Sequence, residues 1–315
     1  MERHLRSPMG RADALASVLD RFQRRFDAAA RLLADPVEFP RRYPDPADAE
    51  VAGLLASCLA YGRADVFKGK LEAVLAAAAP SPAAFAARLA RHPDAEPFAG
   101  FRYRFNRPED VGALFAAAGW VRELHGSLGR RFAVLFGEAK RQGGPWPVRS
   151  ALSAFAGELR AAPPAQALLS RRGLRGLRHL CPDPAAGGAS KRLNLYLRWM
   201  VRGPDGVDLG IWREVPAAEL VVPLDTHVAR VARCLGLTSR TDLSWRTAEE
   251  VTRSLRDIDP RDPVRFDFAL CHLGMSGGCP ARRDSACCRA CPLREVCPAG
   301  RRVLSQRCAG RGGPR

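Results

Sequence analysis

The sequence contains no run of 18 or more uninterrupted apolar residues. The alanine-rich stretch over residues 71–90 is interrupted by Glu72, Pro80 and Pro82, so we do not expect it to cross a membrane. The first residues are basic but lack the apolar segment of a secretion signal. We therefore expect a cytoplasmic protein with no membrane partner.

Alternating patterns of valine, isoleucine and threonine are nearly absent, which excludes a structure built mainly from β-strands. Apolar residues instead recur at helical spacing, for example over residues 14–33, 108–125 and 165–180. Hydrophobic residues make up 47% of the chain, enough for one large core or two moderate ones. The sequence therefore predicts an all-α protein.

Lysine is scarce, because only four of the 50 basic residues are lysines and the other 46 are arginines. With 33 acidic residues the formal net charge is +17. A chain this basic usually meets phosphate or another anionic surface, so nucleic acid is the first candidate partner. The alternative is a merely solvated basic surface, because a GC-rich coding bias would favour arginine without any functional cause.

Cysteine is rare in most of the chain, but seven of the ten cysteines follow Phe268. In a reducing compartment such clustering indicates a metal site, and disulfides are the alternative. Thiolates spaced as Cys288-x2-Cys291-x5-Cys297 can face one iron or zinc centre. One ligand set is Cys279, Cys288, Cys291 and Cys297, with Cys287 as a spare.

Asp225 stands before an apolar helical face in the segment L-D-T-H-V-A-R-V, where a helix N-cap belongs. Read alone, Asp225 is a cap that accepts backbone N–H bonds. Capping is compatible with catalysis, because a carboxylate fixed at a helix start stays ionised and well oriented.

Lys191 begins a predicted helix after the pair Gly187-Gly188. Arginine cannot lose its proton and attack carbon, so a site that needs an amine nucleophile must keep a lysine. In a chain with 46 arginines, Lys191 is therefore the candidate nucleophile. The alternative is an ordinary exposed lysine on a helix.

Two of these motifs resemble the helix-hairpin-helix superfamily of DNA glycosylases. The cysteine tail resembles the iron-sulfur loop of endonuclease III and the adenine glycosylases, although the gap after Cys279 is longer here. The segment around Asp225 resembles the one that carries their catalytic aspartate. The resemblance implies a two-lobed fold, a C-terminal 4Fe-4S cluster in preference to zinc, and Cys287 or Cys288 as the second ligand. The whole chain is more similar to an uncharacterised bacterial glycosylase-like family, a domain of unknown function.

The same resemblance places Lys191 where bifunctional members carry their Schiff-base lysine. The hairpin before it is degenerate, but Gly187 and Gly188 could let backbone N–H groups approach a DNA phosphate, beside Arg192. The spacing of 34 residues from Lys191 to Asp225 exceeds that of endonuclease III. A longer spacing is similar to that of the archaeal 8-oxoguanine glycosylases.

The turn at Tyr61, Gly62 and Arg63 resembles the family segment that fills the hole left by a flipped base. We expect Tyr61 to stack on the unpaired base and Arg63 to reach a phosphate. The alternative is that Tyr61 is simply buried.

The resemblance divides the chain into three units. Residues 1–49 form an N-terminal helix and linker that pack with the C-terminal lobe, 50–216 form a helical barrel, and 217–315 carry the catalytic aspartate and the cluster. The implied function is excision of a damaged base from double-stranded DNA by a monomer, with AP lyase activity if Lys191 forms an imine. The alternatives are a monofunctional glycosylase, a non-catalytic iron-sulfur protein that binds DNA or RNA, and a zinc-bearing structural module.

Overall fold

The computed structural model describes residues 10–171, 173–282 and 284–309. The predicted all-α class is confirmed, because these residues form helices and no strand, with isolated bridges only at Tyr103–Asn106 and Gly188–Ser244. Residues 1–9 and 310–315, at the two ends of the predicted units, lie outside the described part.

The α-helices of the described residues run in chain order as α1 (Arg11–Arg25), α2 (Ala29–Leu32), α3 (Pro46–Leu59), α4 (Ala64–Ala77), α5 (Pro82–Arg91), α6 (Pro108–His125), α7 (Leu128–Gln142), α8 (Pro147–Ala161), α9 (Pro163–Leu169), α10 (Arg175–Leu180), α11 (Lys191–Val201), α12 (Thr226–Leu235), α13 (Trp245–Arg256), α14 (Asp267–Met275), α15 (Ser285–Ala290) and α16 (Pro298–Ala309). Short 3-10 helices are η1 (Pro36–Glu38), η2 (Pro40–Arg42), η3 (Glu96–Phe98), η4 (Pro184–Ala186), η5 (Ala217–Glu219) and η6 (Arg294–Val296).

Two predicted helices are interrupted. The helix expected over 14–33 ends at Arg25, because Phe26 adopts an extended conformation and packs its ring 5.8 Å from that of Phe268. The helix expected over 165–180 is split into α9 and α10, with Gly173 between them at a φ of +71°. In the first case a tertiary contact overrides local helical spacing, and in the second the glycine takes a left-handed conformation.

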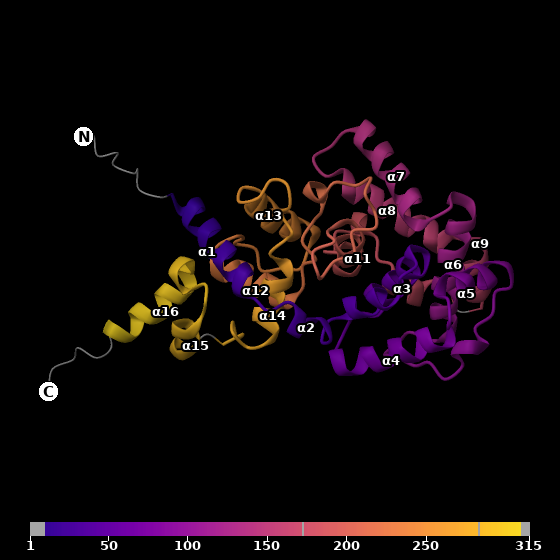
Figure 1. The fold of residues 1–315 in the computed structure, drawn as a ribbon, viewed down its shortest axis with the longest axis horizontal. Coiled ribbons are helices and arrows are strands. Elements are labelled where there is room, and N and C mark those ends of the chain that lie inside the picture. The colour runs from indigo at the N-terminus through magenta and orange to yellow at the C-terminus, as the bar shows by residue number, and fades with distance from the viewer. Residues whose placement is uncertain (1–9, 172, 283, 310–315) are drawn as a thin grey trace.

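Helices α1 and α16 lie at one end of the described part of the molecule, while α5, α6 and α9 lie at the other (Figure 1). Helix α1 packs against η6, and Arg21 pairs with Glu295 at 2.5 Å. Helix α12 packs on both α14 and α16. These contacts position the start of α12 and the cysteine segment within one group of helices.

The other end is built on close helix packing. Helix α6 lies against α5 and α9, and a Cβ at Gly119 would overlap the backbone of Ala86. Helix α3 packs against α11, and all its residues from Ala49 to Leu59 are buried. Because α3 and α11 are both fixed by this core, their ends form rigid supports for the loops beside them.

The buried carboxylate of Glu50 joins α3 to the start of α7 and to the segment that holds Trp212. Glu50 accepts hydrogen bonds from the amides of Leu128 and Gly129 at 3.2 and 3.0 Å and from the Trp212 indole at 2.7 Å. Burial raises the pKa of Glu50, and its hydrogen bonds oppose that shift. These bonds satisfy the first amides of α7, which would otherwise be buried without partners.

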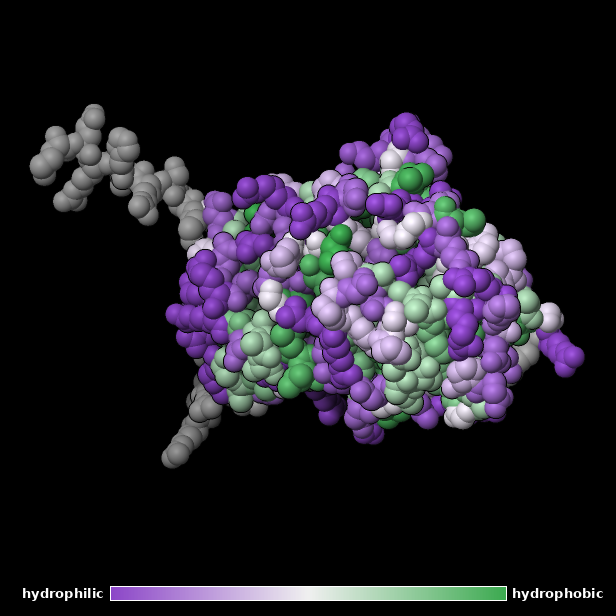
Figure 2. All heavy atoms as spheres, turned by 45° about the vertical axis from the view of Figure 1, so that its right-hand side comes forward, coloured by the Kyte–Doolittle hydropathy of each residue, from purple (hydrophilic) through white to green (hydrophobic). Residues whose placement is uncertain are grey.

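The surface carries hydrophilic and hydrophobic side chains. On the face in Figure 2, hydrophilic groups lie between smaller hydrophobic patches. Among the described residues, no single helix has the length and apolar character needed to cross a membrane. Helices α4 and α5 meet that criterion only as a pair, with a bend of 70° between them.

Candidate functional site

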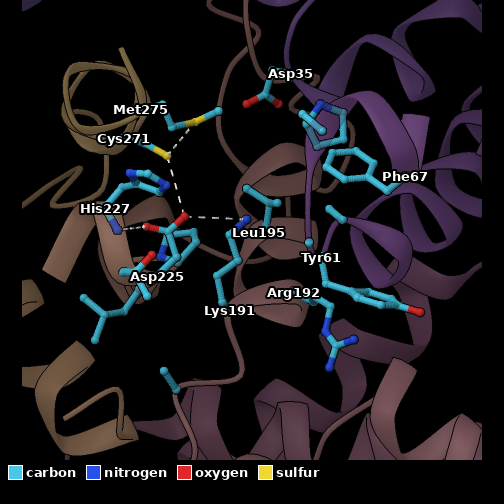
Figure 3. A pocket seen from close by; sticks show the side chains of 18 of the residues that line it. Asp35, Tyr61, Phe67, Lys191, Arg192, Leu195, Asp225, His227, Cys271 and Met275 are labelled. Atoms are coloured by element: carbon cyan, nitrogen blue, oxygen red, sulfur yellow. Dashed lines mark hydrogen bonds and ion pairs between the residues drawn. The ribbon is translucent and has the colours of Figure 1, made fainter. Parts of the chain in front are cut away.

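A pocket of about 730 Å³ lies where the starts of α11 and α12 meet α14 and the turn between α3 and α4 (Figure 3). We call it the Lys191–Asp225 pocket. The residues from its lining that are discussed below are Asp35, Tyr61, Gly62, Arg63, His179, Lys191, Arg192, Arg198, Asp225, Asp267 and Cys271. The structure therefore brings five predicted residues, at positions 61, 62, 63, 191 and 192, into one pocket with Asp225.

Asp225 uses its two oxygens differently. Oδ1 accepts hydrogen bonds from the amides of His227 and Val228, both at 2.9 Å, and so caps α12. Oδ2 faces the pocket, where the Lys191 Nζ lies at 4.0 Å and the Cys271 thiol at 3.8 Å. Figure 3 shows Lys191 reaching toward Asp225 from below. The cap thus fixes the carboxylate while one oxygen remains directed at the lysine.

Lys191 is the first residue of α11, and Ser190 before it has a φ of +46°. This left-handed residue turns the chain sharply into the helix, which directs the Lys191 side chain into the pocket. The side chain is 27% exposed, compared with 22% for Asp225. Both groups are accessible to a ligand but are shielded from most of the solvent.

A second carboxylate lines the pocket and was missed by the sequence analysis. Asp267, at the start of α14, accepts a hydrogen bond from Arg198 at 2.8 Å through Oδ2, while its buried Oδ1 has no partner among the described residues. Burial raises the pKa of Asp267 to about 6; Arg198 opposes the shift and nearby Asp225 adds to it. No motif marks Asp267, since an aspartate in the first turn of a helix is common.

Tyr61 is held inside an aromatic cluster. Its ring stacks on Tyr103 with centroids 4.5 Å apart, and its hydroxyl donates to Asn106 Oδ1 at 2.6 Å. Burial raises the pKa of Tyr61 strongly, and Tyr103 adds to the effect. Gly62, at a φ of +80°, packs so close to Tyr103 that a Cβ would lie 2.6 Å from its hydroxyl.

The two predicted arginines differ in exposure. The Arg63 side chain is 80% exposed at the turn and pairs with Asp65 at 2.6 Å. Arg192 is partly buried: its guanidinium lies 5.3 Å from the centre of the Tyr61 ring and donates to the Cys58 carbonyl at 3.4 Å. Burial lowers the pKa of Arg192. Arg63 is therefore available to a phosphate, whereas Arg192 makes its contacts within the protein.

His179 of α10 completes this side of the pocket and was not identified from sequence. Its ring makes edge contacts with Tyr61 and Phe105, at centroid distances of 4.7 and 4.2 Å. Burial, with the charges of Arg192 and Arg104, lowers the pKa of His179 to about 4. The imidazole is therefore neutral at physiological pH.

Gly187 and Gly188 lie outside the Lys191–Asp225 pocket lining. Gly187 ends η4 at a φ of +89°, and its carbonyl accepts from the Trp245 amide at 2.8 Å. A Cβ at either glycine would meet no atom within 4 Å. The degenerate hairpin is thus an open backbone segment held against the start of α13.

The predicted cysteine ligands surround a small cavity of about 30 Å³, which we call the cysteine cavity. It lies at the C-terminal end of α12, opposite the end that Asp225 caps. The lining cysteines are Cys234, Cys279, Cys287, Cys288, Cys291 and Cys297. Cys234, at the end of α12, was missed by the sequence analysis, and the Cys279 thiol lies 3.7 Å from its sulfur. A lone cysteine on an apolar helix face gives no motif.

The start of α16 brings two of the candidate ligands close together. A Cβ at Gly300 would lie 3.4 Å from the sulfur of Cys297 and 3.8 Å from that of Cys288. These two sulfurs therefore face the same backbone, at the start of α16. Cys287 also lines the cavity, from the first turn of α15, where its amide donates to the Asp284 side chain at 2.8 Å.

No group of three or more Cys, His, Asp or Glu side chains in the described part of the chain is placed to hold a metal ion. A zinc ion needs its sulfurs within about 2.3 Å of one centre, whereas a cluster holds four cysteines around a larger body. Thiols around one cavity are a donor set that suits either a four-cysteine zinc ion or an iron-sulfur cluster.

Comparison of the chain with curated proteins and with solved structures gives no match. A family model described as a protein of unknown function (DUF2400) matches residues 35–276. This region contains all of the Lys191–Asp225 pocket lining except Ala34 and ends just before the predicted ligands of the cysteine cavity. The match covers most of the chain, and the protein therefore belongs to the DUF2400 family.

Proposed function

We propose that the protein is a DNA glycosylase with AP lyase activity that excises a damaged base from duplex DNA. The observation that carries the proposal is the juxtaposition of Lys191 Nζ and Asp225 Oδ2 at 4.0 Å inside one pocket. The pocket volume of about 730 Å³ is within the usual range for ligand sites and is sufficient for a flipped nucleotide.

In the proposed reaction, the neutral amine of Lys191 attacks C1′ of the flipped deoxynucleotide. The new C1′–N bond forms as the glycosidic bond breaks, and the base leaves with the bonding electrons and takes up a proton. Ring opening gives an imine, from which loss of a C2′ proton eliminates the 3′ phosphate and cuts the strand. Each step conserves charge without an external oxidant or reductant.

Asp225 has two functions in this scheme. Its Oδ2, 4.0 Å from the Lys191 Nζ, orients the amine toward the sugar, while solvent takes the ammonium proton and Asp225 stays ionised. The same carboxylate stabilises positive charge as it develops on the sugar. Because Oδ1 is fixed by the helix cap, Oδ2 does not have to reorganise during the reaction.

We further propose that Cys279, Cys288, Cys291 and Cys297 hold a 4Fe-4S cluster. Six cysteines around one cavity support a thiolate-bound metal centre there, and the shared position of Cys288 and Cys297 near Gly300 favours Cys288 over Cys287. When bound, such a cluster would join four points of the segment from Cys279 to Cys297 beside Cys234, at the end of α12.

Double-stranded DNA is the proposed partner. The net charge of +17 supports binding to phosphates, and exposed Arg63 lies at the pocket. Gly187 and Gly188 offer open backbone close to the start of α11. Both places could supply contacts to the phosphates of a duplex whose nucleotide occupies the pocket.

The test is incubation of the purified protein with a panel of duplexes, each carrying one damaged base or an abasic site, in the presence of borohydride. We expect a covalent protein–DNA adduct on at least one substrate, because borohydride reduces the imine. The Lys191→Gln variant should give no adduct, whereas the control Lys140→Gln, whose side chain is 54% exposed, should match the parent.

Two results would contradict this proposal. An adduct that persists in the Lys191→Gln variant would assign the amine to another residue. Duplex binding without adduct or excision on any substrate would favour the alternative of a non-catalytic nucleic-acid-binding protein.

A further inference from the structure

An exposed phenylalanine stands at the tip of a tight turn beside the pocket. The amides and carbonyls of Tyr103 and Asn106 exchange hydrogen bonds at 3.2 and 3.0 Å, which leaves Arg104 and Phe105 at the tip. Arg104 has a φ of +53°, a left-handed conformation that is rare for an arginine. Phe105 is 46% exposed, unlike most phenylalanines of the chain.

The base of this turn is rigid. Tyr103 and Asn106 are buried, and the Asn106 amide donates to the Gly176 carbonyl at 3.1 Å. Tyr103 stacks on Tyr61, which lines the Lys191–Asp225 pocket. A strained tip on a fixed base is costly to maintain, and such features concentrate at functional sites.

Phe105 lies at the edge of the pocket. Its ring centroid is 4.2 Å from that of His179, and His179 lines the pocket. His179 in turn contacts the Tyr61 ring at 4.7 Å. Phe105, His179 and Tyr61 therefore form a continuous series of rings that runs from solvent into the pocket.

The surroundings of Phe105 are cationic. Arg102 and Arg104 on the same turn are exposed, as are Arg175 and Arg178 on α10. Arg63 at the neighbouring turn is 80% exposed, although Asp65 pairs with it. A single aromatic ring among arginines matches a polyanion with stackable bases better than it matches an apolar protein surface.

We propose that Phe105 is a wedge that enters the base stack of duplex DNA next to the nucleotide that occupies the pocket. The phenyl ring fills the gap that the displaced base leaves, and the flanking arginines hold the neighbouring phosphates. This proposal rests on the proposed function, because that function identifies the nucleotide in the pocket as one displaced from duplex DNA. It does not depend on the chemistry that follows displacement.

The wedge function is assigned to Phe105 and not to Tyr61, the residue indicated by the sequence. The Tyr61 ring is already stacked on Tyr103 and its hydroxyl is bonded to Asn106, so its insertion into DNA would break both contacts. Phe105 is 46% exposed and carries no hydrogen-bonding side-chain group, so its insertion would break only its ring contact with His179.

The experiment uses the full-length protein and a duplex with 2-aminopurine beside a tetrahydrofuran abasic analogue. Unstacking of 2-aminopurine raises its fluorescence, so the parent should give a clear increase at saturation. We expect the Phe105→Ala variant to lose at least two thirds of that increase, while its Kd for undamaged duplex changes less than about threefold. Leu124→Ala, another exposed hydrophobic residue at 57%, is the matched control and should behave as the parent.

A second variant, Phe105→Trp, tests the wedge by a gain of signal, which a misfolded protein would not give. In Phe105→Trp the indole emission should be quenched when the abasic duplex binds, and the 2-aminopurine increase should return. A full 2-aminopurine signal in Phe105→Ala, or no quenching in Phe105→Trp, would overturn the proposal.

The outcomes separate this inference from the proposed function. If the wedge signals appear but no substrate gives an adduct or free base, Phe105 remains a wedge and the glycosylase proposal fails. If excision occurs at the parental rate and fluorescence is unchanged in Phe105→Ala, the wedge fails and the glycosylase proposal stands. If the parent binds no duplex, both fail.

Discussion

The Nζ of Lys191 lies 4.0 Å from the Oδ2 of Asp225, although 34 residues separate them in the chain. Lys191 is the first residue of α11 and Asp225 is the N-cap of α12. The starts of two helices therefore converge on one point of the pocket. The positive end of α12 favours the negative charge on Asp225, and the pocket limits its hydration.

The charge of Asp225 and its function as a cap can be separated by substitution. Asparagine caps helices about as well as aspartate, so Asp225→Asn should leave the melting temperature nearly unchanged. Without the charge, base excision should fall by roughly 10²–10³-fold, as when one focused electrostatic group is removed from an active site. Single-turnover excision and thermal melting of the same preparation provide the two measurements.

The alanine variant serves as the comparison for this test. Asp225→Ala should lose the same activity and also about 1 kcal/mol of stability, because the amides of His227 and Val228 lose their acceptor. Excision by Asp225→Asn at the parental rate would reduce Asp225 to a structural cap.

The cysteine cavity gives a second prediction, for the purified protein and two serine variants. Anaerobically purified protein should absorb broadly near 400 nm and contain about four irons per chain. Cys288→Ser should lose most of this absorbance, since its sulfur shares the neighbourhood of Gly300 with that of Cys297. Cys287→Ser, one residue earlier and on the first turn of α15, should retain it.

Iron content and absorbance can refute this assignment directly. Colourless protein with one zinc per chain would contradict the cluster. Loss of colour in Cys287→Ser, with colour retained in Cys288→Ser, would exchange the two cysteines as ligands.

Much of the fold and part of the site could be predicted from short-range patterns in the sequence. Helix α6 has the bounds Pro108–His125 that its apolar spacing predicts, because proline suits a helix start and Gly126 a helix end. Asp225 was recognised as a cap for the same kind of reason, since its side chain bonds amides two and three residues on.

Residues whose importance depends on distant partners were not predictable. His179, Asp267 and Cys234 each stand alone in the sequence and gain their surroundings from other helices. The short α2 likewise follows from the contact of Phe26 with Phe268, which interrupts the preceding helix. Spacing along one helix reports the face that is buried but not the partner that buries it.

His179 allows a third prediction, on stability. Its pKa is lowered to about 4 in the folded protein by burial and by Arg192 and Arg104, against about 6.5 in the unfolded chain. Below pH 6.5 the unfolded state therefore binds a proton that the folded state does not. The contribution of His179 is fully present above pH 6.5 and is lost as the pH falls toward 4, by about 3 kcal/mol at most.

The parent alone would not report this loss cleanly, because Asp267 titrates in the same window with the opposite sign. Its pKa is raised to about 6, so its effect on stability is unfavourable as the pH rises from 4 to 6. The informative quantity is therefore the difference between the parent and His179→Phe, which keeps a ring against Tyr61 and Phe105 but cannot titrate. Urea unfolding of both proteins at half-unit steps from pH 4 to 7.5 should show the variant gaining stability relative to the parent as the pH falls. A difference that is constant across this range would mean that the imidazole has an ordinary pKa, and that the rings between Phe105 and the pocket are hydrated instead of closely packed.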